Sequence, residues 1–387
     1  MSNSDSALAG VVIELADHDE RPSHAMRAVV VRTHGYDVAR AIAVLGMVMV
    51  DVRHEQLAYD RGPAALLWLL NGLEGKAAAL FVLLAGAGLS LRMRRHDVDE
   101  ELHVDRRPFF ERALLLIGGG LLLMHLWKYE ILHFHGIYLL LAIPLLRAHS
   151  RTLWSLAIAS IWVAMVLHNE LDWTVQPTLT LGGAMRHVFF NGLYPVFPWF
   201  AFLLVGMAIG RLDLNDGAVR RRTMTIALVV AFVVAAVDSL GRYEQQTGAL
   251  GLGGLSPWLL TWPREPRPLF VVSGCAIAVA LICGCIALTR EREHSRWVMA
   301  LVATGQLAFT LYVLHVFAIR VPLEHGFLLD SSLELGIFYS IAFYVASIAF
   351  ALWWRRRWPH GPIEGLMRQF IARERPADWH TAGLRRR

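Results

Sequence analysis

The sequence is short of charged residues. Of its 387 residues 18% are charged, whereas 56% are hydrophobic and the mean hydropathy is +0.44. Soluble domains carry about 25% charged residues, so this composition excludes an ordinary soluble enzyme. Lysine is rarer still: apart from Lys76 and Lys128, every Lys or Arg position is an arginine. Because these arginines lie in short segments between apolar blocks, the net charge of +5 does not indicate nucleic-acid binding.

Three further features that the sequence lacks narrow the class of protein: a metal site, a dinucleotide-binding loop and a cleavable signal peptide. The three cysteines, Cys275, Cys283 and Cys285, fall in one apolar block, and the last two point to nearly opposite sides of a helix. We therefore expect no metal site there. The Gly-Ala-Gly sequence at 86–88 lacks the third glycine and the strand context of a dinucleotide loop, and predicts a closely packed helix face instead. No cleavable signal peptide is visible, so we interpret the first apolar block as a retained span.

What the sequence does contain is a series of apolar blocks of about sixteen to twenty-four residues, the length needed to cross a bilayer. We predict an all-α, polytopic integral membrane protein with about ten transmembrane helices. The predicted spans are 36–52, 66–91, 109–127, 130–147, 152–168, 190–210, 223–240, 268–289, 297–320 and 333–354. They divide the chain into a tail at 1–35, a transmembrane domain at 36–354 and a second tail at 355–387.

Arginine marks one side of the predicted membrane. The connections richest in arginine are 92–112, 147–151, 211–222, 290–296 and the segment after residue 354. Such loops stay in the cytoplasm, so we predict that both termini are cytoplasmic. The alanine- and arginine-rich usage suggests a GC-rich bacterial genome, and we expect a multi-pass protein of the inner membrane. In the second tail, apolar residues at helical spacing predict an amphipathic helix on the inner leaflet; they are Ile363, Leu366, Met367, Phe370 and Ile371.

Histidines and other polar residues collect at the opposite, outer ends of these spans. The histidines are His54, His125, His133, His135, His168, His187, His315 and His325, and with them come Asp51, Arg53, Glu55, Glu74, Lys76, Lys128, Glu130, Asn191, Asp238 and Arg320. Histidine exchanges protons near neutral pH, so this layer predicts acid–base chemistry. The alternative interpretation is that outer loops simply need polar residues.

Helical spacing singles out one pair within this layer. Glu130 and His133 are three residues apart, so on a helix they share a face. A carboxylate beside an imidazole orients the ring and raises its basicity, as in many catalytic sites. His135 lies about 200° around the helix from His133 and shares a face with Tyr138, which is typical of a packing histidine.

The inner end of the first span has its own charged pair, Asp37 and Arg40. They either form a self-satisfying ion pair or, with Arg94 and Arg95 of the nearby basic loop, hold an anionic substrate that enters from the cytoplasm.

Two segments are predicted to interrupt their helices. Asn71–Lys76 places two glycines around an acid and a base, and Pro195 and Pro198 stand three residues apart at a span entrance. Irregular backbone of this kind is tolerated where it lines a cavity.

Several stretches resemble one membrane-protein family. Tyr36–Met47 resembles the Asp-x-x-Arg-Gly first-span signature of the YeiB-like proteins and the related heparan-α-glucosaminide N-acetyltransferase-like proteins, with Ala41 at the usual glycine. Further stretches are similar to family landmarks in the same order: Leu80–Leu91, Glu130–His133, Tyr194–Trp199 and Leu311–His315. Together they cover most of residues 32–354.

The resemblance implies a multi-span enzyme that takes acetyl from cytoplasmic acetyl-CoA and delivers it across the membrane to a sugar amine, and hence an acyltransferase-like domain at 36–354. In the family, the catalytic histidine precedes an Asn-Gly-Leu resembling residues 71–73. Here residues 66–70 contain no histidine. Another histidine, such as His54 or His133, would have to serve.

These observations lead to one main functional hypothesis and two alternatives. In the first, the protein is a membrane acyltransferase whose acetyl-CoA phosphates dock near Asp37 and Arg40 and whose base is His133, oriented by Glu130. The acceptor is a hydroxyl or amine of a glycan or envelope component, no metal is expected, and a homodimer is possible. The alternatives are a transporter or flippase without covalent chemistry, which the broken segments favour, and a non-catalytic membrane partner.

Overall fold

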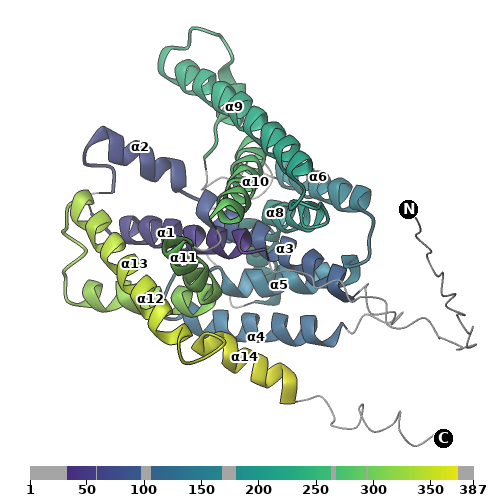
Figure 1. The fold of residues 1–387 in the computed structure, drawn as a ribbon. Helices are drawn as coiled ribbons and strands as arrows, with labels where there is room; N and C mark the ends of the chain where they lie inside the picture. Colours follow the sequence, from purple (N-terminus) through teal and green to yellow (C-terminus); the bar gives the residue numbers. More distant parts are fainter. Residues whose placement is uncertain are drawn as a thin grey trace, which may run out of the picture. The chain divides into compact units, whose positions relative to one another are not determined.

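The computed structural model describes residues 33–57, 59–96, 106–167, 180–262, 267–292 and 295–373. Within these ranges the regular secondary structure is helical, as predicted (Figure 1). The α-helices are α1 (Gly35–His54), α2 (Ala64–Leu73), α3 (Lys76–His96), α4 (Arg107–Met124), α5 (Leu132–Ala142), α6 (Ser150–Leu167), α7 (Leu181–Arg186), α8 (Val196–Ile209), α9 (Gly217–Thr247), α10 (Pro268–Glu291), α11 (Arg296–Gln306), α12 (Ala308–Glu324), α13 (Leu333–Arg355) and α14 (Pro362–Arg373).

Several helices are long and apolar enough to cross a membrane. Five meet that criterion: residues 64–94, which join α2 and α3, and the helices α6, α9, α10 and α13. Two bent pairs, α7 with α8 and α11 with α12, bring the number to as many as seven. Large apolar side chains on α6, α9 and α13 are exposed, including Trp162, Phe232 and Phe338. The protein is therefore a polytopic membrane protein.

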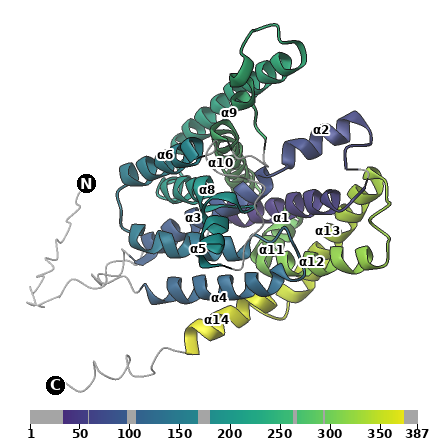
Figure 2. The same cartoon turned by 180° about the vertical axis from the view of Figure 1, so that it is seen from behind.

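The three remaining predicted spans correspond to α1, α4 and α5, which are more charged or shorter. α1 is the centre of the bundle: it packs against α3, α10, α11 and α13, and both views show it among them (Figures 1 and 2). Its Asp37, Asp51 and Arg53 are buried in protein. A helix can keep such charges at membrane depth when it faces other helices and not lipid. The exact number of spans and their orientation stay predictions.

Three helices are interrupted. At 71–76, where the sequence predicts a break, α2 ends at Leu73 and α3 begins at Lys76, with Gly75 at φ 70° between them. The second predicted break, at Pro195 and Pro198, is also present. α7 continues into a π-helical turn, and the helix axis bends by 52° between this segment and α8. The third break was not predicted. Residues 297–320 were expected to form one span, but α11 and α12 meet at Leu307 at an angle of 76°.

Close helix packing at two glycines holds α3 against α8. A methyl group at Gly86 would lie 2.1 Å from the carbonyl oxygen of Leu203, and one at Gly206 would lie 2.0 Å from that of Leu83. The backbones can approach this closely only without a Cβ atom, as small residues allow in membrane helices. The close-packing face predicted for residues 86–88 is confirmed at Gly86.

Replacing Gly86 by alanine should therefore destabilise the bundle. We expect the free energy of unfolding in detergent to fall by about 1–3 kcal/mol, because the α3 and α8 backbones must separate. Thermal and denaturant unfolding of the purified protein would measure the change. Gly284→Ala is the matched control, since nothing lies within 4 Å of a methyl group there. Equal effects of the two substitutions would contradict the packing argument.

Candidate functional site

Three histidine–carboxylate pairs form one polar layer around the end of α1 that carries Asp51 and His54. The distances from ring nitrogen to carboxylate oxygen are 2.5 Å for His133–Glu130, 3.0 Å for His315–Asp51 and 3.3 Å for His54–Glu74. Sequence spacing predicts only the first pair. In the other two pairs the partners come from different parts of the fold. His54 of α1 meets Glu74, which lies between α2 and α3, and His315 of α12 meets Asp51 of α1.

Glu130 organises the first pair. It precedes α5, and its carboxylate accepts hydrogen bonds from the backbone N–H groups of Leu132 and His133 as well as contacting Nδ1 of the His133 ring. Glu130 thus satisfies amides that the first turn of a helix leaves unpaired. The contact predicted from helical spacing is present, but α5 begins at Leu132 and not at residue 130, because Glu130 acts from outside the helix.

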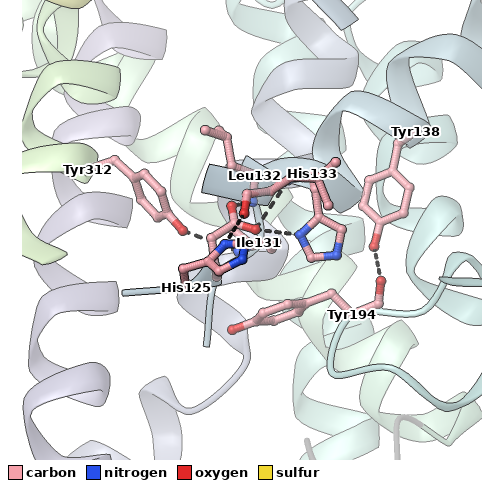
Figure 3. Close-up of polar contacts among 9 residues, drawn as sticks. His125, Ile131, Leu132, His133, Tyr138, Tyr194 and Tyr312 are labelled. Carbon is pink, nitrogen blue, oxygen red and sulfur yellow. Dashed lines mark hydrogen bonds and ion pairs between the residues drawn. The ribbon is translucent and has the colours of Figure 1, made fainter. Parts of the chain in front are cut away.

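The environment of His133 leaves one ring nitrogen available. Glu130 and His133 are both buried. With Nδ1 held by the carboxylate, no described residue forms a hydrogen bond with Nε2 of His133. Figure 3 shows one tyrosine contact on each side of the ring. The hydroxyl of Tyr312 accepts a bond from the N–H of Ile131, and the hydroxyl of Tyr138 donates to the backbone carbonyl of Tyr194. An imidazole held in this way is suited to accept a proton at Nε2.

Close packing of α4 against α5 positions His133. A methyl group at Gly120 of α4 would lie 2.2 Å from the backbone nitrogen of His133, and one at Gly136 of α5 would lie 2.6 Å from the carbonyl oxygen of Ala113. The two glycines therefore let the backbones touch, so the position of His133 is set by main-chain contacts.

His54 lies in the same layer. Its Nε2 faces Glu74, which also accepts a hydrogen bond of 2.8 Å from the hydroxyl of Tyr59. The ring of His54 stacks on Tyr59 and lies 4.9 Å from that of Tyr129, the residue before Glu130. The structure thus brings His54 beside the segment that carries Glu130 and His133.

The pair between Asp51 and His315 was not predicted, although both residues belong to the predicted polar layer. His315 is fully buried; its Nε2 faces Asp51, and its Nδ1 faces the carbonyl oxygen of Tyr312. Both ring nitrogens therefore face oxygen atoms, so polar contacts hold the ring on two sides. The rings of Trp127 and Tyr312 lie beside it.

The remaining histidines of the predicted layer have other roles or positions. The exposed His125 and His325 contact carbonyls of their own helices. His135 is buried against the rings of Phe81 and Tyr138, as predicted for a packing histidine. His187 lies beside Phe134 at the start of the π-helical turn that follows α7. His168 lies outside the described residues.

A second charged group surrounds the other end of α1. Arg40 and Asp37 form the predicted ion pair at 2.7 Å, and the Arg40 side chain keeps 31% of its surface exposed. Arg112 of α4, which was not singled out from the sequence, is within electrostatic reach of Arg40 and Arg92. Arg94 is exposed and donates to the carbonyl oxygen of Leu212 at 3.4 Å. The side chain of Arg95 lies outside the described part of the structure.

The two polar ends of α1 are separated along one rigid helix. Arg40 and Asp51 are eleven residues apart, which corresponds to about 16 Å along the axis. Within the described residues, no group of three or more His, Cys, Asp or Glu side chains could hold a metal ion. α1 therefore has a cationic end and, about 16 Å along its axis, an end surrounded by a layer of imidazoles and carboxylates.

Fold and polar layer together define a polytopic membrane protein with groups suited to acid–base chemistry. Residues 32–244 match the family described as "Heparan-alpha-glucosaminide N-acetyltransferase, catalytic", and residues 213–374 match "Protein of unknown function (DUF418)". The first match covers more than half of the chain, so the protein belongs to this family, which indicates a membrane-bound acetyltransferase; the family uses acetyl-CoA. Both matches confirm the resemblance seen in the sequence. A comparison with curated proteins finds no match.

Replacing Asp51 by alanine should lower the free energy of unfolding. Asp51→Ala leaves His315 buried without its carboxylate partner, and we expect a loss of about 3–5 kcal/mol in the free energy of unfolding. Glu324→Ala is the control, because it breaks an exposed ion pair of 2.9 Å with Arg320 and should cost less than about 1 kcal/mol. Denaturant unfolding in detergent would compare them. Similar small losses would contradict a buried pair in which His315 depends on Asp51.

Proposed function

We propose that the protein transfers an acyl group, most simply acetyl, from cytoplasmic acyl-CoA to a hydroxyl or amine of a glycan or envelope acceptor outside a bacterial inner membrane. Membership in the acetyltransferase family supports the class of reaction. The single observation that carries the site assignment is His133, whose Nδ1 is held 2.5 Å from Glu130 and whose Nε2 has no described partner.

In the proposed reaction, Nε2 of His133 removes the proton from the acceptor hydroxyl or amine as that group attacks the thioester carbonyl. The new bond joins the acceptor to the acyl carbon, and the carbon–sulfur bond breaks. The imidazolium then returns its proton to the coenzyme A thiolate. Glu130 holds the ring in one orientation and stabilises its protonated form.

The cationic end of α1 would bind the donor. Coenzyme A carries several phosphates, and guanidinium groups are well suited to phosphate recognition. Arg40, Arg92 and Arg112 gather at this end, and we assign the predicted Asp37 to holding Arg40 in place. Arg94 and Arg95 follow on α3. The separation of about 16 Å along α1 would be bridged by the long pantetheine arm of the donor.

The sidedness of the reaction follows from the arginine-rich connections. Positive residues favour the cytoplasm, which would place the Arg40 end inside and the histidine layer outside. The acceptor would then reach His133 from the envelope side. His54, oriented by Glu74, is the alternative base in the same layer.

We expect His133→Ala to lower the turnover number for acetyl transfer by about 10²–10⁴-fold, which is the usual contribution of a general base. Membranes containing each variant would be supplied with labelled acetyl-CoA, and acetylated envelope material would be quantified. His325→Ala is the control, because that exposed ring contacts only its own helix. Should His54→Ala abolish transfer while His133→Ala leaves it intact, the base would be His54.

A transporter or flippase is the second candidate, and the two bent helix pairs favour it, since broken helices line the substrate paths of many transporters. Purified protein in vesicles with labelled acetyl-CoA on one side separates the two functions. Acyl transfer yields labelled, covalently modified acceptor. Movement of an envelope substrate across the vesicle without any modified product would instead establish transport and refute the acyltransferase.

A further inference from the structure

The C-terminal helix α14 contacts the bend between α11 and α12 through one carboxylate. Glu364 accepts hydrogen bonds from the backbone N–H groups of Phe309 at 2.9 Å and Thr310 at 3.1 Å, and from the hydroxyl of Thr310 at 2.5 Å. The N–H of Ile363 donates to the same hydroxyl at 3.2 Å. Three of these bonds end on a single side chain, so Glu364 is the main polar attachment of α14 to α12.

Glu364 supplies what α12 lacks in its own sequence. The first amides of a helix have no partner within it, and a negative charge at that end is favourable. Leu307, at the position that would cap α12, cannot accept these bonds through its side chain. The cap therefore comes from a residue 54 positions further along the chain. Gly361 also packs here, with Leu307 3.0 Å from where its Cβ would lie.

The same bend touches the proposed donor site. A methyl group at Gly305, at the end of α11, would lie 1.7 Å from the carbonyl oxygen of Asp37, so the two backbones are in direct contact. Asp37 in turn holds Arg40 at 2.7 Å. A continuous series of contacts thus runs from Glu364 through the bend and Asp37 to Arg40.

Charge places α14 at the same end of the bundle. Arg112 is within electrostatic reach of Arg40 and Arg92 and, from α14, of Arg368 and Glu364. α14 packs against both α4 and α12, and it lies beside α4 in Figures 1 and 2. Arg112 therefore faces three other arginines and one acid, Glu364, whose negative charge offsets part of the repulsion on Arg112.

We propose that Glu364 is a positioning residue of the acyl-donor site. By capping α12 it holds the α11–α12 bend against Asp37, and so keeps Arg40 oriented towards the donor phosphates. The inference rests on the proposed function, because it assumes that acetyl-CoA binds at the Arg40 end. It gives the C-terminal helix, predicted from sequence only as a membrane-surface element, a part in donor binding.

The test compares donor affinity with acceptor affinity in the full-length protein. Glu364→Ala should raise both the Kd for acetyl-CoA and the donor KM about tenfold, on the scale of one charge-assisted hydrogen bond. The acceptor KM should change less than about twofold. Equilibrium binding of labelled acetyl-CoA gives the Kd without requiring turnover.

Glu244→Ala is the matched control. Glu244 of α9 is also a buried carboxylate that accepts two backbone N–H bonds, each of 2.7 Å, but its donors Leu250 and Leu252 lie in the loop after α9. A purely structural cap should affect stability in both variants and donor affinity in neither. Thr310→Val is a milder second variant: it removes the hydroxyl contact, keeps the two amide bonds, and should raise the donor Kd in the same direction by a smaller factor.

The outcomes are distinct. An unchanged donor Kd in folded Glu364→Ala or Thr310→Val, or equal rises in donor and acceptor KM, overturns the positioning role while leaving the acyltransferase intact. Weakened acetyl-CoA binding without any acyl transfer in the unaltered protein supports the positioning role and refutes the proposed reaction. An unaltered protein that binds no acetyl-CoA refutes both. If Glu364→Ala does not fold, Thr310→Val decides.

Discussion

The need to pair every carboxylate buried among membrane helices organises this protein. Desolvating a charge is expensive unless a counter-charge or hydrogen-bond donors replace water. Asp37 is matched by Arg40, Asp51 by His315, and Glu130 by His133 and two backbone amides. The Asp51–His315 pair joins α1 to α12, and Glu130 satisfies the first amides of α5, so polar groups of the proposed site also contribute to the fold.

The sequence predicts those features of the structure that depend on local pattern. Apolar blocks indicate the helices, glycines and prolines indicate two of the three breaks, and spacing of three residues predicts the contacts of Asp37 with Arg40 and Glu130 with His133. The bend at Leu307 and the Asp51–His315 pair were not predicted. They depend on partners 54 and 264 residues away, and no local periodicity records such a distance.

α1 gives the molecule its two polar ends. Its neighbours cover it on several sides, which lets one helix carry Asp37 and Arg40 at one end and Asp51 and His54 at the other. Because a helix is stiff, the spacing between the two ends is set by residue count and not by loop conformation. The remaining elements, α5 with His133 and α12 with His315, add histidines to an end that α1 already defines.

The Asp51–His315 contact has a consequence for how this chain can vary in evolution. Asp51 lies in the part of the chain that matches the acetyltransferase family, whereas His315 lies in the part that matches the second family. Neither part can complete the polar layer alone. Exchange of the C-terminal portion between relatives would therefore preserve this contact only when donor and recipient carry compatible residues at both positions.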